Sequence, residues 1–250
     1  MPRFALIRQL EAVGFRAWPA TSVHFDGTWA IRLTASFPSK RLNSVNPLDR
    51  ADWANMEERV GRAVQRFRTF GRIPTFRQTP LSPKALEEHL ELRGWRRMNE
   101  TIVMIADISA IDFSDAIDQI PLKDTGRFVE AALAVRERDA KLKPGLAEVI
   151  ASINPACGMF VVEDRGRPVS TAMCVQEGPL AGLVEVGTSR PLRRQGHGRK
   201  IVASALKWAR KQGAVRAWVQ VDAENEAALA LYRRFGFEEA YRYHYRQGAA

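Results

Sequence analysis

The chain has 250 residues and a formal net charge of +10; 46% of its residues are hydrophobic and 26% are charged. This composition is ordinary for a soluble globular protein, and the length suffices for one large domain or two small ones. Two cysteines exclude a disulfide framework, and no spacing of cysteine and histidine predicts a metal site. No uncharged stretch is long enough to span a membrane, and residues 1–18 lack the apolar core of a signal peptide. We therefore expect a cytoplasmic protein that binds no metal and enters no membrane.

The first 110 residues alternate helices with strands. In chain order we expect a helix over residues 3–13, a hairpin of strands 23–25 and 28–34, a helix over 52–70, a strand over 73–78, a helix over 83–93 and a strand over 101–108. The Asp26-Gly27 pair is a strong hairpin signal, and Gly14, Gly71 and Gly94 are expected to end the three helices.

From residue 113 the pattern changes to two helices, an antiparallel meander and a βαβ-like end. The expected elements are helices over 125–138 and 146–153, strands over 159–163, 169–176 and 180–188, a helix over 198–212, a strand over 215–221, a helix over 224–235 and a strand over 241–245. This order predicts an α+β fold with one parallel crossover.

One offset of 142 residues relates the two halves. It pairs Gly71 with Gly213 and Gly94 with Gly236, and both copies read helix, glycine, strand, helix, glycine, aromatic residue, strand. Chance pairing of glycines is the alternative, but a constant offset over two helices and a strand favours duplication. The first copy lacks the polar and glycine positions of the second, because Ala54, Met56, Pro83 and Leu90 stand where the second has Gly196, Gly198, Asn225 and Tyr232.

The strongest local signal lies between a predicted strand and an amphipathic helix. It consists of Arg193, Arg194, Gln195, Gly196, His197 and Gly198. Glycines at a helix start let the backbone approach a ligand closely, and exposed amides aided by the helix dipole hold phosphate. A tight strand-to-helix turn is the alternative. A second signal is the helix that begins after Asn225, which holds Tyr232 on its buried side, where a core tyrosine is the alternative to a catalytic one.

Together these signals resemble the GNAT superfamily of acyl-CoA N-acyltransferases over residues 113–246. The superfamily's phosphate-loop pattern, Arg/Gln-x-x-Gly-x-Gly/Ala, and its later pattern, Asn-x-x-Ala-x-x-x-Tyr followed by Gly-Phe, are met by Arg193, Gly196, Gly198, Asn225, Ala228, Tyr232, Gly236 and Phe237. One departure is Pro191, which sits one residue closer to the loop than is usual. The first half is similar to tandem GNAT proteins in the stretches 29–32 and 41–45.

The resemblance implies an α+β fold of two GNAT-like units, each a central mixed, mostly antiparallel sheet flanked by helices, with the N-terminal unit incomplete. Residues 1–110 would form the degenerate unit and residues 111–250 the catalytic one. Arg32, Arg41 and Asn43 would either pin a structural network or reach the second unit's cleft, and we favour the structural role.

In GNAT folds the strands corresponding to residues 180–188 and 215–221 splay apart, and the pantetheine arm of acetyl-CoA lies between them as an added strand would. The resemblance therefore implies diphosphate binding by the amides of Gln195, Gly196, His197 and Gly198, with added charge from Arg193 and Arg194. Asn225 would contact pantetheine, or would only cap its helix. A backbone amide of Val186, Gly187 or Thr188 would bind the thioester oxygen.

The implied reaction is direct attack of a neutral amine on the thioester, with Tyr232 as the acid for the leaving thiolate and Glu185 as the base. Because strand side chains alternate, Glu185 could instead face the opposite surface. The acceptor would be a small-molecule or protein amine. The basic segment 136–143 lies where acceptor loops lie in the superfamily, and we favour a solvated loop over a contact for an acidic acceptor.

Two alternatives to an enzyme are open at the level of the sequence. One is a catalytically idle acyl-CoA-binding or sensor module. The other is a nucleic-acid binder, which only the +10 charge favours; the basic residues are spread along the whole chain, so nucleic acid is the less favoured partner. The sequence leaves open whether the protein is a monomer or a homodimer.

Overall fold

The computed structural model describes residues 4–114 and 116–249. The helices in these ranges are α1 (Phe4–Ala17), α2 (Met56–Thr69), α3 (Lys84–Leu92), α4 (Thr125–Val135), α5 (Lys143–Ala151), α6 (His197–Lys211) and α7 (Glu226–Arg234). The strands are β1 (Ser22–Asp26), β2 (Trp29–Leu33), β3 (Ser44–Pro47), β4 (Thr75–Gln78), β5 (Arg96–Asp107), β6 (Ala156–Asp164), β7 (Arg167–Glu177), β8 (Leu180–Thr188), β9 (Arg216–Asp222) and β10 (Glu238–Gln247). No helix in the described ranges is long and apolar enough to cross a bilayer.

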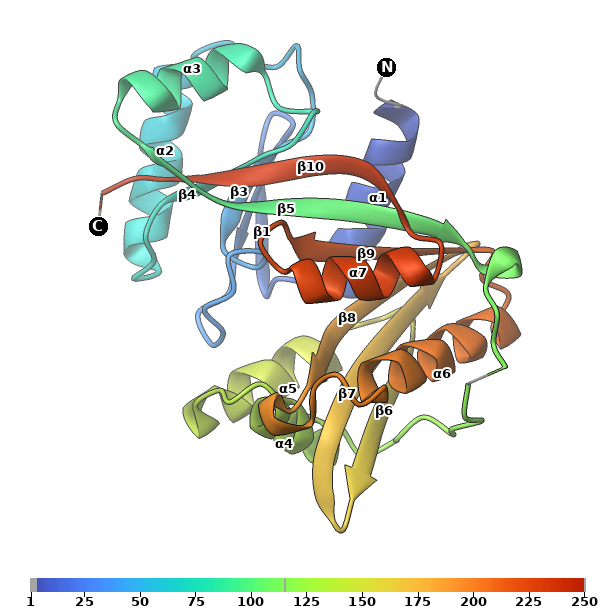
Figure 1. Cartoon of the computed structure of the whole chain (residues 1–250). Coiled ribbons are helices and arrows are strands. Elements are labelled where there is room, and N and C mark those ends of the chain that lie inside the picture. Colours follow the sequence, from blue (N-terminus) through green and yellow to red (C-terminus); the bar gives the residue numbers. More distant parts are fainter. Residues whose placement is uncertain (1–3, 115, 250) are drawn as a thin grey trace.

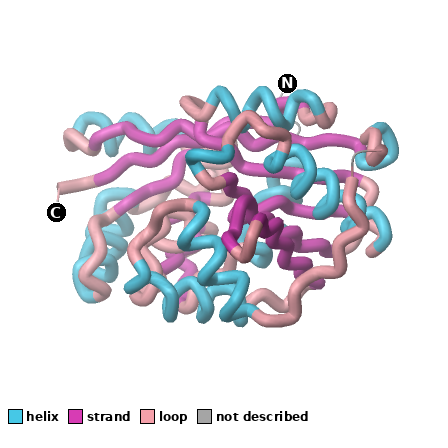
Figure 2. Tube along the Cα trace, turned by 60° about the horizontal axis from the view of Figure 1, so that its bottom comes forward, coloured by secondary structure: helices cyan, strands magenta, loops and turns pink. Residues whose placement is uncertain are grey.

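The described strands form one mixed sheet in the order β1-β2-β3-β4-β10-β5-β9-β8-β7-β6. The neighbours β3–β4 and β8–β9 run parallel, and the other neighbours run antiparallel. Figures 1 and 2 show this sheet as a twisted layer with helices on both faces. The predicted α+β class with a mixed sheet flanked by helices is confirmed.

The final strand of each half meets the other half at the centre of the sheet. β10 pairs with both β4 and β5, and β5 pairs with both β10 and β9. The two halves therefore share one continuous sheet, in which β10 lies next to β4 of the first half and β5 lies next to β9 of the second. As a result, side chains from both halves of the chain can reach the region around β8 and β9.

The two faces of the sheet carry different cores. In β7, Met173 and Val175 join the core under α1, α4 and α5, whereas Ala172 and Cys174 join the core under α6 and α7. Successive side chains of a strand point to opposite faces. The helices α6 and α7 thus lie on the face opposite α1, α4 and α5. Where two strands of the sheet separate between these helices, the opening is accessible from both faces.

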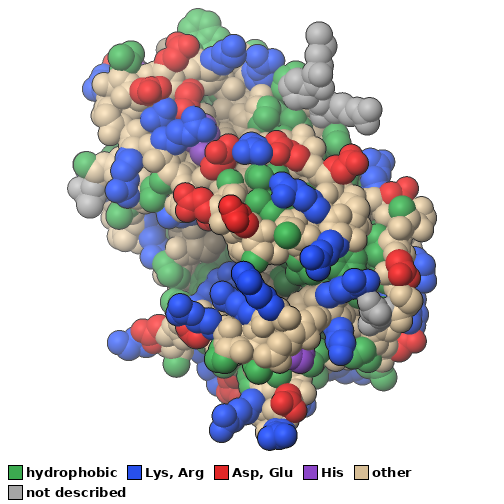
Figure 3. All heavy atoms as spheres, viewed as in Figure 1, with side chains coloured by type: hydrophobic (Ala, Val, Ile, Leu, Met, Phe, Trp, Pro, Cys, Tyr) green, Lys and Arg blue, Asp and Glu red, His purple; other side chains and the backbone are tan. Residues whose placement is uncertain are grey.

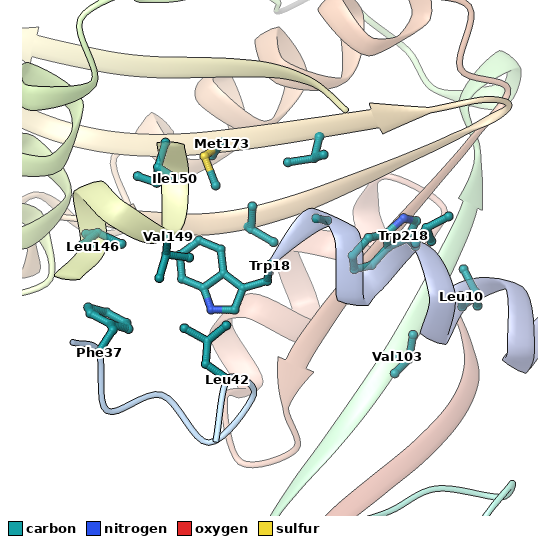
Figure 4. Close-up of a cluster of buried hydrophobic side chains, with 14 of the residues drawn as sticks. Leu10, Trp18, Phe37, Leu42, Val103, Leu146, Val149, Ile150, Met173 and Trp218 are labelled. Atoms are coloured by element: carbon teal, nitrogen blue, oxygen red, sulfur yellow. The ribbon is translucent and has the colours of Figure 1, made fainter. Parts of the chain in front are cut away.

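Residues of the N-terminal half are packed into the core on the α4–α5 face. Figure 4 shows Trp18, Phe37 and Leu42 against Val149 and Met173. Phe37 and Leu42 have exposed fractions of only 4% and 0%. Burial of large side chains of this kind stabilises each by about 1.5–3 kcal/mol. The loop of residues 37–42 is therefore fixed beside α5 and β7 rather than hanging in solvent.

Most predicted elements are confirmed within a few residues, and β8 has the predicted bounds. The prediction that Gly14 ends the first helix is wrong, since α1 continues to Ala17; Arg3, its predicted first residue, lies outside the described residues. A Cβ at Gly14 would lie 3.3 Å from Nε2 of Gln220. Gly14 therefore lets α1 pack closely on β9, and does not stop the helix. The predicted boundary between residues 110 and 111 stays a prediction.

Candidate active site

The parallel strands β8 and β9 separate halfway along their length. Their pairing runs from Leu180 opposite Arg216 to Leu183 opposite Val219, and neither strand pairs with the other beyond these residues. Both strands continue, β8 to Thr188 and β9 to Asp222 (Figure 1). A cavity of about 570 Å³ lies at this divergence. The predicted splay of these two strands is confirmed.

A β-bulge bends β8 at the start of the divergence. Thr171 of β7 faces Gly187 and Met173 faces Val184, so two residues of β8 oppose one of β7. The bulge includes Glu185, which has a φ of +50°. A left-handed backbone at a residue other than glycine is uncommon and tends to mark functional positions. Because bulges turn a strand and re-aim its side chains, this one leads β8 away from β9.

The glycine loop that follows β8 is open. Gly196 has a φ of +83°, and a Cβ placed on it would meet nothing within 4 Å. Among the described residues, none accepts a hydrogen bond from the backbone amides of residues 194–198. The side chains of Arg193, Arg194 and Gln195 are exposed, and His197 is half-buried. Bare amides at the start of α6 are suited to binding an anion.

Close packing behind the loop sets its position. A Cβ on Gly198 would lie 3.2 Å from Oγ1 of Thr188 and 3.6 Å from Leu231 of α7. Nε of Arg193 donates to the Thr188 carbonyl at 3.3 Å, so this side chain also holds the loop to the end of β8. Figure 3 shows that the surface is hollowed between the two lobes, with Lys and Arg side chains along the lower rim of the hollow.

Tyr232 lies in the cavity wall on the α7 side. Its exposed fraction is 4%, and its ring packs edge-on against Phe237 with 5.5 Å between centroids. No described residue makes a hydrogen bond with its hydroxyl, and burial raises the pKa of Tyr232. The group is therefore a protonated donor at neutral pH. Asn225 lines the same cavity, and its side chain caps α7 by accepting a hydrogen bond from the Ala228 amide at 3.1 Å.

Glu185 also lines the cavity. Its Oε2 lies 2.8 Å from Nη1 of Arg138, and its side chain is 8% exposed. Beside it, Nη1 of Arg136 donates to the Val186 carbonyl at 3.1 Å. The alternative in which Glu185 faces away from the cleft is therefore excluded. Gly187 lies against the Val135 and Arg136 side chains, which leaves no room for a Cβ without displacement.

Three residues of the first half were expected to have structural roles in preference to reaching the cleft of the second half. Arg32 is buried and donates to the carbonyls of Arg41 and Trp18. Asn43 binds the backbone of the loop before it. Arg41 instead lines the cavity and donates from Nη2 to the carbonyl of Gln220 at 3.2 Å. Arg41 therefore meets both alternatives, since it bridges to β9 and also reaches the cleft.

Sequence reasoning missed several residues of the cavity wall. They are Trp18, Phe37 and Lys40 from the first half, Asn99 and Thr101 from β5, and Tyr243 and Tyr245 from β10. No local signal marks them, because the residues of β5 and β10 reach the cleft through the central pairing of these strands, and those of the first half reach it through packing against α5. Within the described ranges, no group of three or more histidine, cysteine, aspartate or glutamate side chains is placed to hold a metal ion.

This fold, with a bulged strand diverging from a parallel neighbour in front of an open glycine loop, defines the GNAT class of N-acetyltransferases. The chain belongs to the family described as "Probable histone acetyltransferase Rv0428c C-terminal", whose family model matches residues 5–246. The protein is a GNAT-type N-acetyltransferase, and the resemblance to that superfamily is confirmed.

One similar sequence and two similar solved structures each cover nearly the whole of this chain. The protein described as "Uncharacterized N-acetyltransferase YobR" of Bacillus subtilis (strain 168) is 23% identical over 249 residues, which cover 96% of this chain and 98% of YobR. The GCN5-related N-acetyltransferase from Kribbella flavida has a TM-score of 0.70 at 18% identity, covering 100% of this chain and 97% of its own. A tandem GNAT protein from the clavulanic acid biosynthesis pathway has a TM-score of 0.59 at 12% identity, covering 96% and 88%. At these identities the two solved structures establish the fold alone.

Proposed function

We propose that the protein transfers an acetyl group from acetyl-CoA to a primary amine by direct attack in a ternary complex. The observation that carries the proposal is the meeting of three features at one place. The bare amides of residues 194–198 lie beside the divergence of β8 and β9, and the cavity at the divergence is lined by Tyr232 and Glu185. A phosphate site, a channel and two groups able to move protons are what acyl transfer from a CoA thioester requires.

The amides of Gln195, Gly196, His197 and Gly198 would hold the diphosphate, assisted by the positive end of α6. The pantetheine arm would enter where β8 and β9 no longer pair, and would use their free backbone groups as an added strand does. Asn225, next to that path, keeps α7 capped. An amide of Val186, Gly187 or Thr188 would then donate to the thioester oxygen as negative charge develops there.

In the chemical step the amine nitrogen attacks the thioester carbon, an amide bond forms, and the carbon–sulfur bond breaks. Tyr232, whose hydroxyl stays protonated at neutral pH because burial raises its pKa, gives its proton to the departing thiolate. Glu185 accepts the proton that the amine loses, directly or through water. Its ion pair with Arg138 holds the carboxylate in the cavity wall. The larger part of the acceleration comes from placing amine and thioester together.

We further propose that the chain is a tandem of two GNAT-like units, the first degenerate. Three observations support duplication. The sheet order is symmetric about the β10–β5 pair, with each outer parallel pair in the corresponding place. Asn55 and Gly196, which precede α2 and α6, both have positive φ. So do the two glycine pairs at the 142-residue offset, Gly71 with Gly213 and Gly94 with Gly236. The similar tandem GNAT protein agrees in fold.

Calorimetric titration with acetyl-CoA, followed by thiol detection during incubation with acetyl-CoA and an amine library, tests the proposed activity. We expect saturable binding and amine-dependent release of CoA. Binding without turnover for any amine would favour the idle acyl-CoA-binding module instead. Absence of binding would overturn the cofactor assignment.

A further inference from the structure

The cavity wall opposite α7 is strongly basic. Lys40, Arg41, Arg136 and Arg138 all line the cavity, and we call these four residues the cationic wall. The acidic residues that line the same cavity are Glu185 and Asp222. The transfer described above uses the position of Arg138 beside Glu185 and assigns no task to the other three cations. The charge of this wall therefore needs its own explanation.

Most of this positive charge is not neutralised by neighbouring carboxylates. Lys40 donates from Nζ to Oδ1 of Asn99 at 2.8 Å, while Arg41 and Arg136 donate to backbone carbonyls. These acceptors are neutral, so they orient the cations without cancelling their charge. Only Arg138 is paired with a carboxylate among the described residues, that of Glu185. An anionic group entering the cavity would meet cations already held in place.

The cationic wall is separate from the diphosphate loop. Lys40 and Arg41 follow Phe37, which belongs to the core on the α1, α4 and α5 face of the sheet. Tyr232 and α6 belong to the core on the opposite face, where the loop of residues 193–198 begins α6. Acetyl-CoA bound to that loop therefore approaches the divergence from one face. The cationic wall borders the other face, which is the side left for the acceptor.

The segment that carries Lys40 and Arg41 is preorganised. Asn43 donates from Nδ2 to the carbonyls of Phe37 and Ser39, both at 2.9 Å, and accepts from the Thr34 amide at 2.8 Å. Arg32 donates to the Arg41 carbonyl at 2.8 Å. A segment fixed in this way loses little conformational freedom when a ligand binds. Guanidinium groups so placed suit a planar carboxylate, which they bind with two parallel hydrogen bonds.

We infer that the acceptor is a primary amine that also carries a carboxylate, with the carboxylate at the cationic wall and the amine directed toward Glu185. The inference rests on the proposed acetyl transfer and names its substrate class. A singly charged carboxylate fits better than a dianionic phosphate, because Glu185 and Asp222 lie in the same cavity and would repel the larger charge. This inference assigns residues 136–143 the contact with an acidic acceptor, in place of the solvated loop that the sequence favoured.

The test compares matched amines that differ only in the carboxylate. The probes are β-alanine against β-alaninamide, and the amidated peptides Ser-Glu-Glu-Ala against Ser-Gln-Gln-Ala, each with acetyl-CoA. We expect the carboxylate member of a pair to be used with a kcat/KM at least about tenfold higher. The pair that shows the preference tells whether the carboxylate belongs to a small molecule or to a peptide.

Variants locate the preference at the cationic wall. Arg41→Gln and Lys40→Gln should each reduce the preference several-fold to about tenfold, because kcat/KM falls more for the carboxylate probe than for the amide probe while the Kd for acetyl-CoA stays the same. Arg41→Lys should retain part of it. Arg242→Gln is the control, since Arg242 is exposed on β10 and pairs with Glu239 outside the cavity. Melting temperatures check that each variant is folded, and Lys40→Gln serves where Arg41→Gln is unstable.

The outcomes separate this inference from the proposed function. Turnover of the amide probes at least equal to that of the carboxylate probes overturns the inference and leaves acetyl transfer intact. Equal loss for both probes in Arg41→Gln also overturns it, because Arg41 would then act on structure alone. If no probe and no library amine consumes acetyl-CoA, the proposed function fails and the inference fails with it.

Discussion

Glu185 and Arg138 form an ion pair with 2.8 Å between Oε2 and Nη1, although they come from different elements, the bulge of β8 and the turn after α4. The bulge gives Glu185 its positive φ and places its carboxylate in the cavity at the divergence of β8 and β9. The candidate base is thereby held by a cation instead of being free to rotate. A substitution at Glu185 that removes the charge but keeps the shape of the side chain separates a role in proton transfer from a structural role.

Glu185→Gln keeps the shape of the side chain and removes its ability to take a proton. We expect kcat at pH 7 to fall by a factor on the order of 100. The difference from the wild type should narrow toward pH 10, because a primary amine with an ordinary pKa of about 10.4 is then increasingly neutral on arrival. Steady-state rates across pH measure this. Glu163→Gln, which removes an exposed pairing with Arg127, is the matched control. Parallel pH profiles for Glu185→Gln and the wild type would exclude Glu185 as the base.

Gly196→Glu places a carboxylate where the diphosphate is expected. We predict that binding of acetyl-CoA weakens by a factor of about 100 or more while the protein remains folded, since a Cβ at Gly196 meets nothing within 4 Å. Gly166→Glu is the control, because Gly166 has a φ of +75° and equally open surroundings. Both substitutions strain the backbone alike, by about 1–2 kcal/mol. Calorimetry gives the Kd, and an unchanged value for Gly196→Glu would remove the phosphate-loop assignment.

Tyr232→Phe removes only the hydroxyl that faces the cavity. We expect kcat to fall about 10- to 100-fold with little change in the Kd for acetyl-CoA, because the thiolate would leave without its proton donor. Tyr241→Phe is the comparison, since the Tyr241 hydroxyl donates to the buried carboxylate of Glu11. That change should lower the free energy of unfolding by about 1.5–3 kcal/mol and leave kcat intact. Normal turnover in Tyr232→Phe would exclude Tyr232 as the essential acid.

Glu87 on α3 makes the free energy of unfolding depend on pH. Partial burial acts to raise the pKa of Glu87, but hydrogen bonds from His244 and Arg246 outweigh it and lower the pKa to about 2 from 4.5. Its contribution to stability is therefore complete above about pH 4.5 and is lost as the pH falls toward 2. Glu87→Gln should lower the free energy of unfolding by about 2 kcal/mol at pH 7, after allowance for its exposed part, and by much less at pH 2.

Thermal unfolding of the wild type and Glu87→Gln at several pH values between 7 and 2 tests this contribution. Glu88→Gln, at the exposed neighbouring position, should track the wild type throughout. A constant difference between Glu87→Gln and the wild type over the whole range would show that the loss arises from packing and not from the charge.

The local part of the site could be predicted from the sequence. The glycines of the loop after Arg193 give backbone freedom at a helix start, and the apolar stripe of the following residues fixes that helix. The mostly apolar run of residues 180–188 predicts a strand whose bounds the structure confirms. These features depend on neighbours a few residues apart, so spacing suffices to reveal them. The roles of Tyr232, Glu185 and the loop residues in the reaction stay predictions.

Other features depend on contacts that sequence spacing does not record. The face on which Glu185 lies follows from a bulge at a residue that is not glycine, and strand alternation cannot predict it. The strand β3 has only four residues and ends at Pro47, too short a run for alternation to be seen. The place of Arg41 in the cavity wall was not predicted for the same reason, because its contact with Gln220 crosses between the two halves of the chain.

The sequence by itself determined most of the helices and strands, the GNAT class and the position of the glycine loop, because each depends on residues close together along the chain. Only the tertiary structure decided which residues of the first half line the cavity. The insertion of β10 between β4 and β5 joins the two halves into one sheet, and the packing of Phe37 and Leu42 beneath α5 brings Lys40 and Arg41 to the cleft. Pairing of distant strands and burial of distant side chains are set by the free energy of the whole fold, which no local pattern encodes.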